Sequence, residues 1–170
     1  VHGLIAAKED QAKEDQTKED QAKEDQATGA EWGCHGTAIP GADKKYIGSG
    51  ADNTRRILAG CNEDGIAAKI AADYIVVEDG ITYDDWFLPS IDELEKFIVI
   101  LFDLGAFEEY MYDSVSYWSS TQEKGVAFIG GSDWALYFGF DVNHFYVDED
   151  GHRGSMEKKY KLNVRAIRAF

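Results

Sequence analysis

The stretch that most constrains this chain runs from Tyr83 to Ile98 and predicts a strand, a corner and a capped helix. Its apolar run, 86–88, ends at Pro89, which cannot donate a ladder hydrogen bond and biases the preceding residue toward extended geometry. Ser90 and Glu93 have the spacing of a capping box. Beyond them one helical face is apolar, formed by Ile91, Leu94, Phe97, Ile98, Leu101 and Leu104.

Composition limits the kinds of partner this chain can have. The sequence has 170 residues, 44% hydrophobic and 13% aromatic, enough for a packed core. A formal charge of -15 and a pI near 4.5 argue against binding to nucleic acid or to anionic membranes. No apolar run approaches the roughly 20 residues of a membrane span, and no signal peptide begins at Val1. We therefore expect neither a nucleic-acid partner nor membrane insertion.

Residues 8–26 form a tandem repeat in which Lys-Glu-Asp-Gln occurs four times with a period of five. A period of five walks around a helix of 3.6 residues per turn, so it builds no apolar stripe, and it is not a heptad. The unit also has no large apolar residue to bury by stacking. The sequence predicts an inserted, charged surface loop, and the alternative is a ribbon that meets a partner or other copies of itself.

The remaining segments predict an α+β fold, with helices in the first half and short strands in the second. Helices are expected at 55–60 and from Asn62 onward, the second with an inner stripe of Ile66, Ala67, Ile70, Ala71 and Tyr74. Strands are expected at 3–7, 115–121, 134–140, 145–147 and 162–166. In the segment 134–140, Trp134, Leu136, Phe138 and Phe140 share one face, and Ala135, Tyr137 and Gly139 the other.

The two cysteines, Cys34 and Cys61, are too few for a structural zinc site without histidines. They either form one disulfide that closes a loop of about 27 residues or are two buried thiols. On the chain-entropy model such a disulfide adds about 3 kcal/mol.

Several short motifs, taken together, resemble the family of Lcl C-terminal domains, a domain first described at the end of a bacterial collagen-like adhesin. They occur in this order: Gly3–Ala7, Glu31-Trp32-Gly33-Cys34, Asn53-Thr54, Asp84–Ser90 with Glu93-Leu94, Tyr117-Trp118-Ser119-Ser120, and Val164–Phe170. The resemblance covers nearly the whole chain.

The resemblance implies a single C-type-lectin-like domain over residues 1–170, with two main helices and small twisted antiparallel sheets. It also implies a Cys34–Cys61 disulfide and a secreted or surface-bound bacterial module involved in adhesion and carbohydrate binding. Two features depart from the family pattern. The family has one polar unit where this chain has four, and it has a glycine-rich strand before Gly3 that is missing here. A missing strand would leave a sheet edge that something must cover.

The residues do not support an enzyme. A related fold hosts formylglycine-generating oxidases that use a late cysteine pair, but no cysteine follows Cys61. The histidines are scattered, and no spacing supports a triad built from Ser119, Asp141 and His144. We therefore expect a non-enzymatic protein without a cofactor.

In lectin-like folds the ligand surface is built from loops between the late strands, and the resemblance therefore implies a ligand-binding set in this part of the chain. That set is Tyr137, Asp141, Asn143, His144, Tyr146, Asp148, Asp150, His152 and Arg153. Asp148 and Asp150 also stand before Gly151 in a turn that can begin a calcium site, but a solvated acidic turn is the preferred interpretation. Trp86, Trp118 and Trp134 are expected in the core, and Arg165 and Arg168 are expected to pair with carboxylates.

Three functions are compatible with these observations. The first is an extracellular adhesion module that binds a glycan or a cell-surface protein. The second is a subunit of a bacterial surface filament or sheath, self-associating by strand exchange, which the missing first strand and the abrupt start at Val1 suggest. The third is a phage-type receptor-binding protein with diversified late loops.

Overall fold

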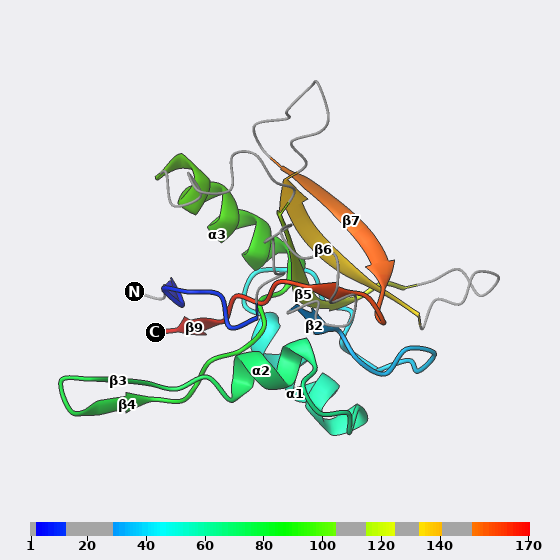
Figure 1. The fold of residues 1–170 in the computed structure, drawn as a ribbon, viewed down its shortest axis with the longest axis horizontal. Coiled ribbons are helices and arrows are strands. Elements are labelled where there is room, and N and C mark those ends of the chain that lie inside the picture. Colours follow the sequence, from blue (N-terminus) through cyan, green and yellow to red (C-terminus); the bar gives the residue numbers. More distant parts are fainter. Residues whose placement is uncertain (1–2, 13–28, 105–114, 125–132, 141–150) are drawn as a thin grey trace, which may run out of the picture.

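The computed structural model describes residues 3–12, 29–104, 115–124, 133–140 and 151–170 and shows an α+β protein (Figure 1). The helices are α1 (Gly50–Gly60), α2 (Ala67–Ala72) and α3 (Ile91–Asp103). The strands are β1 (Leu4–Ala6), β2 (Ala30–Glu31), β3 (Val76–Glu78), β4 (Ile81–Tyr83), β5 (Val115–Gln122), β6 (Trp134–Phe140), β7 (His152–Glu157), β8 (Lys161–Leu162) and β9 (Ile167–Ala169). They pair antiparallel as β1–β9, β2–β8, β3–β4 and β5–β6–β7.

The predicted corner is present, and its capping box is confirmed. Ser90 N–H donates to Glu93 Oε2 at 2.7 Å, and Glu93 N–H donates to Ser90 Oγ at 3.4 Å. The buried side chains of Ile91, Leu94 and Ile98 then pack against β5 and β6. The predicted strand at 86–88 is shorter than expected, because only Phe87 pairs, through an isolated bridge to Ile167.

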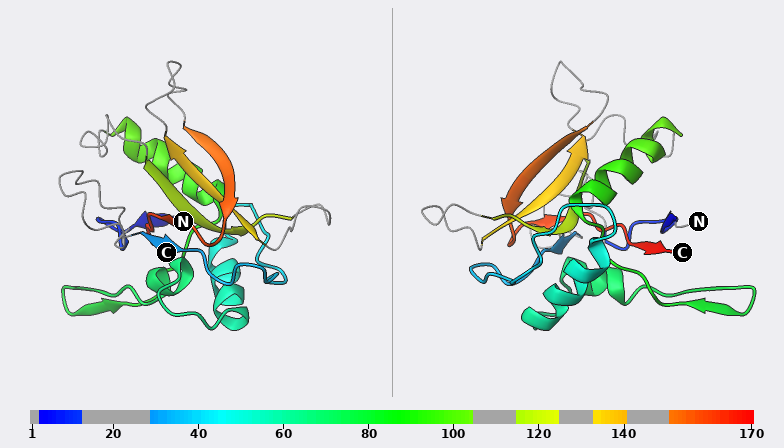
Figure 2. Two further views of the ribbon diagram at one scale, coloured as in Figure 1. Left: turned by 45° about the vertical axis from the view of Figure 1, so that its right-hand side comes forward. Right: turned by 180° about the vertical axis from the view of Figure 1, so that it is seen from behind.

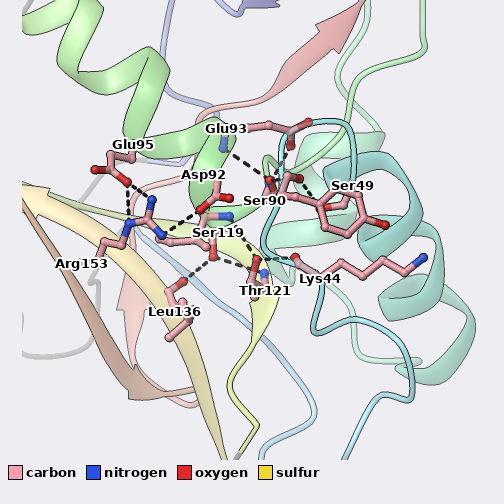
Figure 3. Close-up of polar contacts among 12 residues, drawn as sticks. Lys44, Ser49, Ser90, Asp92, Glu93, Glu95, Ser119, Thr121, Leu136 and Arg153 are labelled. Atoms are coloured by element: carbon pink, nitrogen blue, oxygen red, sulfur yellow. Dashed lines mark hydrogen bonds and ion pairs between the residues drawn. The ribbon is translucent and has the colours of Figure 1, made fainter.

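Glu93 fastens this corner to the loop that precedes α1 (Figure 3). Its carboxylate is 1% exposed and accepts from the backbone N–H groups of Gly48, at 2.8 Å, and Ser90. Glycine is needed at position 50 to make space for this carboxylate, because a Cβ there would lie 2.3 Å from Glu93 Oε2. A negative charge in the first turn of α3 is also favoured by the helix dipole.

The irregular middle of β5 is attached to the same corner. Its register with β6 shifts between Trp118 and Gln122, and the hydroxyl residues in the shift, 119–121, are fully buried. Thr121 Oγ1 donates to Lys44 C=O at 3.0 Å and accepts from Ile91 N–H at 3.1 Å (Figure 3). Ser120 N–H donates to Pro89 C=O at 2.7 Å.

A second core lies below the sheet, around α1, α2 and β2. Trp32 and Trp118 are both fully buried there. The indole N–H of Trp32 donates to Ser119 C=O, and that of Trp118 donates to Ala30 C=O, both at 2.9 Å. The expectation that Trp86 and Trp118 are core residues is confirmed, whereas Trp134 is only half-buried.

Several predicted boundaries were wrong. Helix α1 begins at Gly50 rather than at Arg55, and α2 begins at Ala67 rather than at Asn62. The central helix ends at Asp103, and Leu104, assigned to its inner face, is 75% exposed. The first strand is present as β1, but Leu4 and Ile5 are 38% and 41% exposed rather than buried. The final strand is divided into β8 and β9, and the predicted strand 145–147 lies outside the described residues.

The hairpin of β3 and β4 extends away from the body in Figures 1 and 2. Asp79 and Gly80 have φ values of 52° and 78°, so the two-residue connection between β3 and β4 has positive φ at both positions, as a type I′ turn does. The two ends of the described chain lie side by side, because β1 pairs with β9.

Both predicted arginine pairs are confirmed. Arg168 forms an ion pair with Asp85, and Arg165 forms one with Asp10.

Lys158 is an unexpected buried cation. It is 0% exposed, its Nζ lies 4.4 Å from the centroid of the Trp32 ring, and it donates to Thr37 C=O and Gln122 Oε1, both at 2.8 Å. Burial lowers the pKa of Lys158 from its ordinary 10.5 to about 8, although the nearby Asp133 charge acts in the opposite direction.

Replacing Glu93 by Gln should destabilise the protein by about 1–3 kcal/mol. The amide of glutamine can accept through only one of its two terminal atoms, so one of the two buried backbone N–H groups loses its acceptor. Urea unfolding measures the loss, and Glu78→Gln, on the exposed hairpin, is the matched control. Equal midpoints for the two variants would contradict this account of the corner.

Because of Lys158, the free energy of unfolding should increase as the pH rises from about 8 to 10.5. In that window the unfolded chain keeps a proton that the folded lysine has lost, so stability rises with pH. The measurement is the pH dependence of the unfolding free energy. Lys158→Met should remove this contribution, whereas Lys96→Met, at an exposed position, should leave it intact. An unchanged slope in Lys158→Met would show that the lysine is not responsible.

Candidate functional site

The predicted ligand-binding residues fall into two groups. Asp141, Asn143, His144, Tyr146, Asp148 and Asp150 lie outside the described residues, and with them the predicted calcium ligands Asp148 and Asp150. Tyr137 lies in β6, and His152 and Arg153 lie in β7. Placing His152 and Arg153 in a loop was therefore wrong, since both belong to the three-stranded sheet.

Tyr137 and His152 come together on one face of this sheet. His152 pairs with Gly139, two residues along β6 from Tyr137, so strand alternation points both side chains the same way. Their ring centroids are 5.9 Å apart at an interplanar angle of 84°, an edge-to-face contact. His152 is exposed and Tyr137 is half-buried.

Glycines surround this aromatic pair and keep the sheet surface low. Gly154 is opposite Tyr137, and a Cβ added there would lie 2.5 Å from the tyrosine ring. Gly139 is opposite Ser116, and a Cβ there would lie 2.5 Å from Ser116 Oγ. The face therefore presents two rings and the hydroxyls of Tyr137 and Ser116 above two glycines, and we call it the Tyr137 face.

Arg153 points to the other side of the sheet. Its register partner is Phe138, whose side chain packs toward α3. The guanidinium donates to Asp92 Oδ1 at 2.8 Å and pairs with Glu95, both in the first turns of α3 (Figure 3). The structure thus separates Arg153 from Tyr137 and His152, and its observed contacts hold β7 against α3.

The disulfide between Cys34 and Cys61 is present, as the family resemblance implied. Among the described residues one group of side chains has metal-like spacing, namely Cys34, Cys61 and Glu63. Both sulfurs are in the disulfide, and Glu63 Oε2 accepts from Cys34 N–H at 2.7 Å. This group is therefore a covalent brace with a hydrogen-bonded carboxylate and not a cation site.

Ser119, which sequence analysis considered and rejected as a nucleophile, is buried in the described structure. It is 0% exposed and its hydroxyl donates to Leu136 C=O at 2.7 Å. The other members of that imagined triad, Asp141 and His144, lie outside the described residues.

Sequence reasoning missed three exposed apolar side chains at the β3–β4 hairpin. Ile75, Val77 and Ile81 are 58%, 67% and 54% exposed. The signal was available, since an Asp-Gly pair between β-branched runs is a strong hairpin pattern. Within the described residues no helix is long and apolar enough to cross a membrane.

Comparison with protein-family models finds no match for this chain, and comparison with curated proteins finds no similar sequence.

Proposed function

We propose that this protein is an extracellular, non-enzymatic binding module that holds a glycan or a protein partner on the Tyr137 face and the adjoining segment 141–150. The observation that carries the proposal is the edge-to-face pair of Tyr137 and His152 above glycines, on a sheet face opposite to α3. Aromatic rings with a few polar groups are the usual lining of small-ligand sites.

The chemistry of this face suits a sugar ring. An aromatic side chain offers an apolar surface to the C–H groups of a sugar, and the Ser116 and Tyr137 hydroxyls can exchange hydrogen bonds with its hydroxyl groups. Glycine at 139 and 154 gives the Ser116 hydroxyl and the Tyr137 ring room to lie close to the backbone of the sheet.

Chain connectivity supports placing the remaining predicted ligand residues nearby. Segment 141–150 leads from the end of β6 at Phe140 to the start of β7 near His152. Any ligand on the Tyr137 face therefore lies next to the point where this segment rejoins the sheet. The ion pairs of Arg153 hold that end of β7 in place.

The same proposal includes a C-type-lectin-like fold and a location on or outside a bacterial surface. Pairing of the first and last strands, small antiparallel sheets and two main helices support the fold. The disulfide supports an oxidising, extracellular setting.

His152→Ala should weaken glycan binding about tenfold, the change that corresponds to losing one contact of about 1.4 kcal/mol. Binding on a glycan array measures the effect, and His35→Ala is the matched control because His35 is an exposed histidine between β2 and α1, outside this sheet. Unfolding midpoints of both variants should stay near that of the unchanged protein. Identical array profiles for the two variants would refute a glycan site on the Tyr137 face.

A specific observation also favours the alternative of a self-associating surface subunit. Among the described residues β1 pairs only with β9, so its outer edge is open to another strand. Leu4 and Ile5 on this strand, Phe170 beyond β9 and the hairpin residues Val77 and Ile81 are all exposed apolar side chains.

If this alternative holds, the protein should form oligomers, and Val77→Asp combined with Ile81→Asp should make it monomeric. Two charges on the hairpin would have to be desolvated in an apolar contact. Sedimentation velocity over a range of concentrations measures this, with Ile47→Asp, which changes an isoleucine that is 53% exposed elsewhere, as the control. A protein that stays monomeric throughout would exclude the alternative.

A further inference from the structure

The first unit of the tandem repeat is held by specific contacts and is not merely a surface loop. The Asp10 carboxylate pairs with the guanidinium of Arg165 and accepts from the Tyr117 hydroxyl at 3.0 Å. Gln11 Oε1 accepts from Ala166 N–H at 2.6 Å. The Asp10 side chain is 1% exposed and that of Arg165 is 10% exposed, so this ion pair is buried.

Backbone bonds fix the same segment against the residues between β8 and β9. Gln11 N–H donates to Val164 C=O, and Val164 N–H donates to Ala12 C=O, both at 2.9 Å. Lys8 and Glu9, in contrast, have exposed side chains. We call the set of Tyr117, Arg165 and the backbone of 164–166 the Arg165 cradle, and it binds the Asp-Gln half of the unit.

The same Asp-Gln pair recurs three more times in the repeat, as residues 15–16, 20–21 and 25–26. The fourth unit matches the first most closely, because Ala22 and Ala27 flank it as Ala7 and Ala12 flank the first. The residue after the unit matters, because Ala12 forms the bridge to Val164 that Ala27 would have to replace. The second and third units each have Thr17 on one side instead.

The strand register leaves room for the fourth unit. Ala12 pairs with Val164 and Ala30 pairs with Leu162, so a single residue of the partner strand separates the two pairings. With the fourth unit in the cradle, Ala27 would oppose Val164, and Thr28 and Gly29 would oppose one residue. Two residues opposite one is the arrangement of a β-bulge.

The chain left out of the cradle has nearly the same length in both arrangements. With the first unit bound, the sixteen residues 13–28 lie between Ala12 and Gly29, and with the fourth bound the fifteen residues 8–22 lie between Ala7 and Lys23. Loop-closure entropy depends on length, so it does not separate the two arrangements. Binding the second or third unit would divide the chain into two loops, each with its own closure entropy.

We propose that the Arg165 cradle is a binding site for the Lys-Glu-Asp-Gln unit itself, and that the first and fourth units compete for it within one chain. The repeat then supplies interchangeable ligands for one site. Strand β1 keeps its pairing with β9 in either arrangement, because the exchange begins after Ala7.

Three variants test the proposal by urea unfolding. The first carries Asp10→Ala with Gln11→Ala, the second Asp25→Ala with Gln26→Ala, and the third has Ala-Ala in place of every Asp-Gln pair in the repeat. Either double variant should lower the folding equilibrium constant only about twofold, because one of two equivalent ligands remains. The third variant should lose on the order of a hundredfold, because the buried Arg165 then has no carboxylate partner.

A second measurement separates exchange from a purely structural role of the first unit. The side-chain Nε–H resonance of Arg165 should keep its native chemical shift in the first variant and lose it in the third. A hundredfold loss in the first variant with none in the second would overturn the proposal. So would equal stability of all three variants, or a rescue of the first variant that depends on protein concentration, since the occupant would then come from a second copy.

Discussion

The buried carboxylate of Glu93 is the interaction on which the rest of the structure depends. It accepts backbone N–H groups from the corner and from the loop before α1, and thereby ties the start of α3 to the first half of the chain. Thr121 attaches β5 to the same place through its hydroxyl. These groups have left water, so each must keep its partner or the whole junction loses stability.

This junction separates the molecule into two packing regions with one shared sheet. On one side α3 packs on Leu136 and Phe138, and on the other Trp32 and Trp118 join β5 to the α1–α2 core. The sheet carries both, since successive side chains of a strand point to opposite faces. The Tyr137 face lies on the same side of the sheet as Trp118, toward β7.

Where the sequence pattern was local, it predicted the structure. The capping box, the inner face of α3 up to Ile98 and the alternation of β6 depend on spacing alone. The boundaries of α1 and α2 failed, because tertiary contacts decide how far a short helix extends. Only part of the candidate site could be predicted from the sequence. Nothing in the spacing of residues 151–154 indicated a strand, in which His152 and Arg153 point to opposite faces.

The corner and the α+β class can be predicted from local patterns, because propensity, capping and periodicity act over a few residues, and the charge and the repeat are read directly from the residues. The contact of Asp10 with Arg165, 155 residues later in the chain, comes from the fold. It likewise brought Tyr137 beside His152 and placed Lys158 over Trp32. Such contacts join residues far apart in the chain, and they follow from strand register and burial, which no local pattern contains.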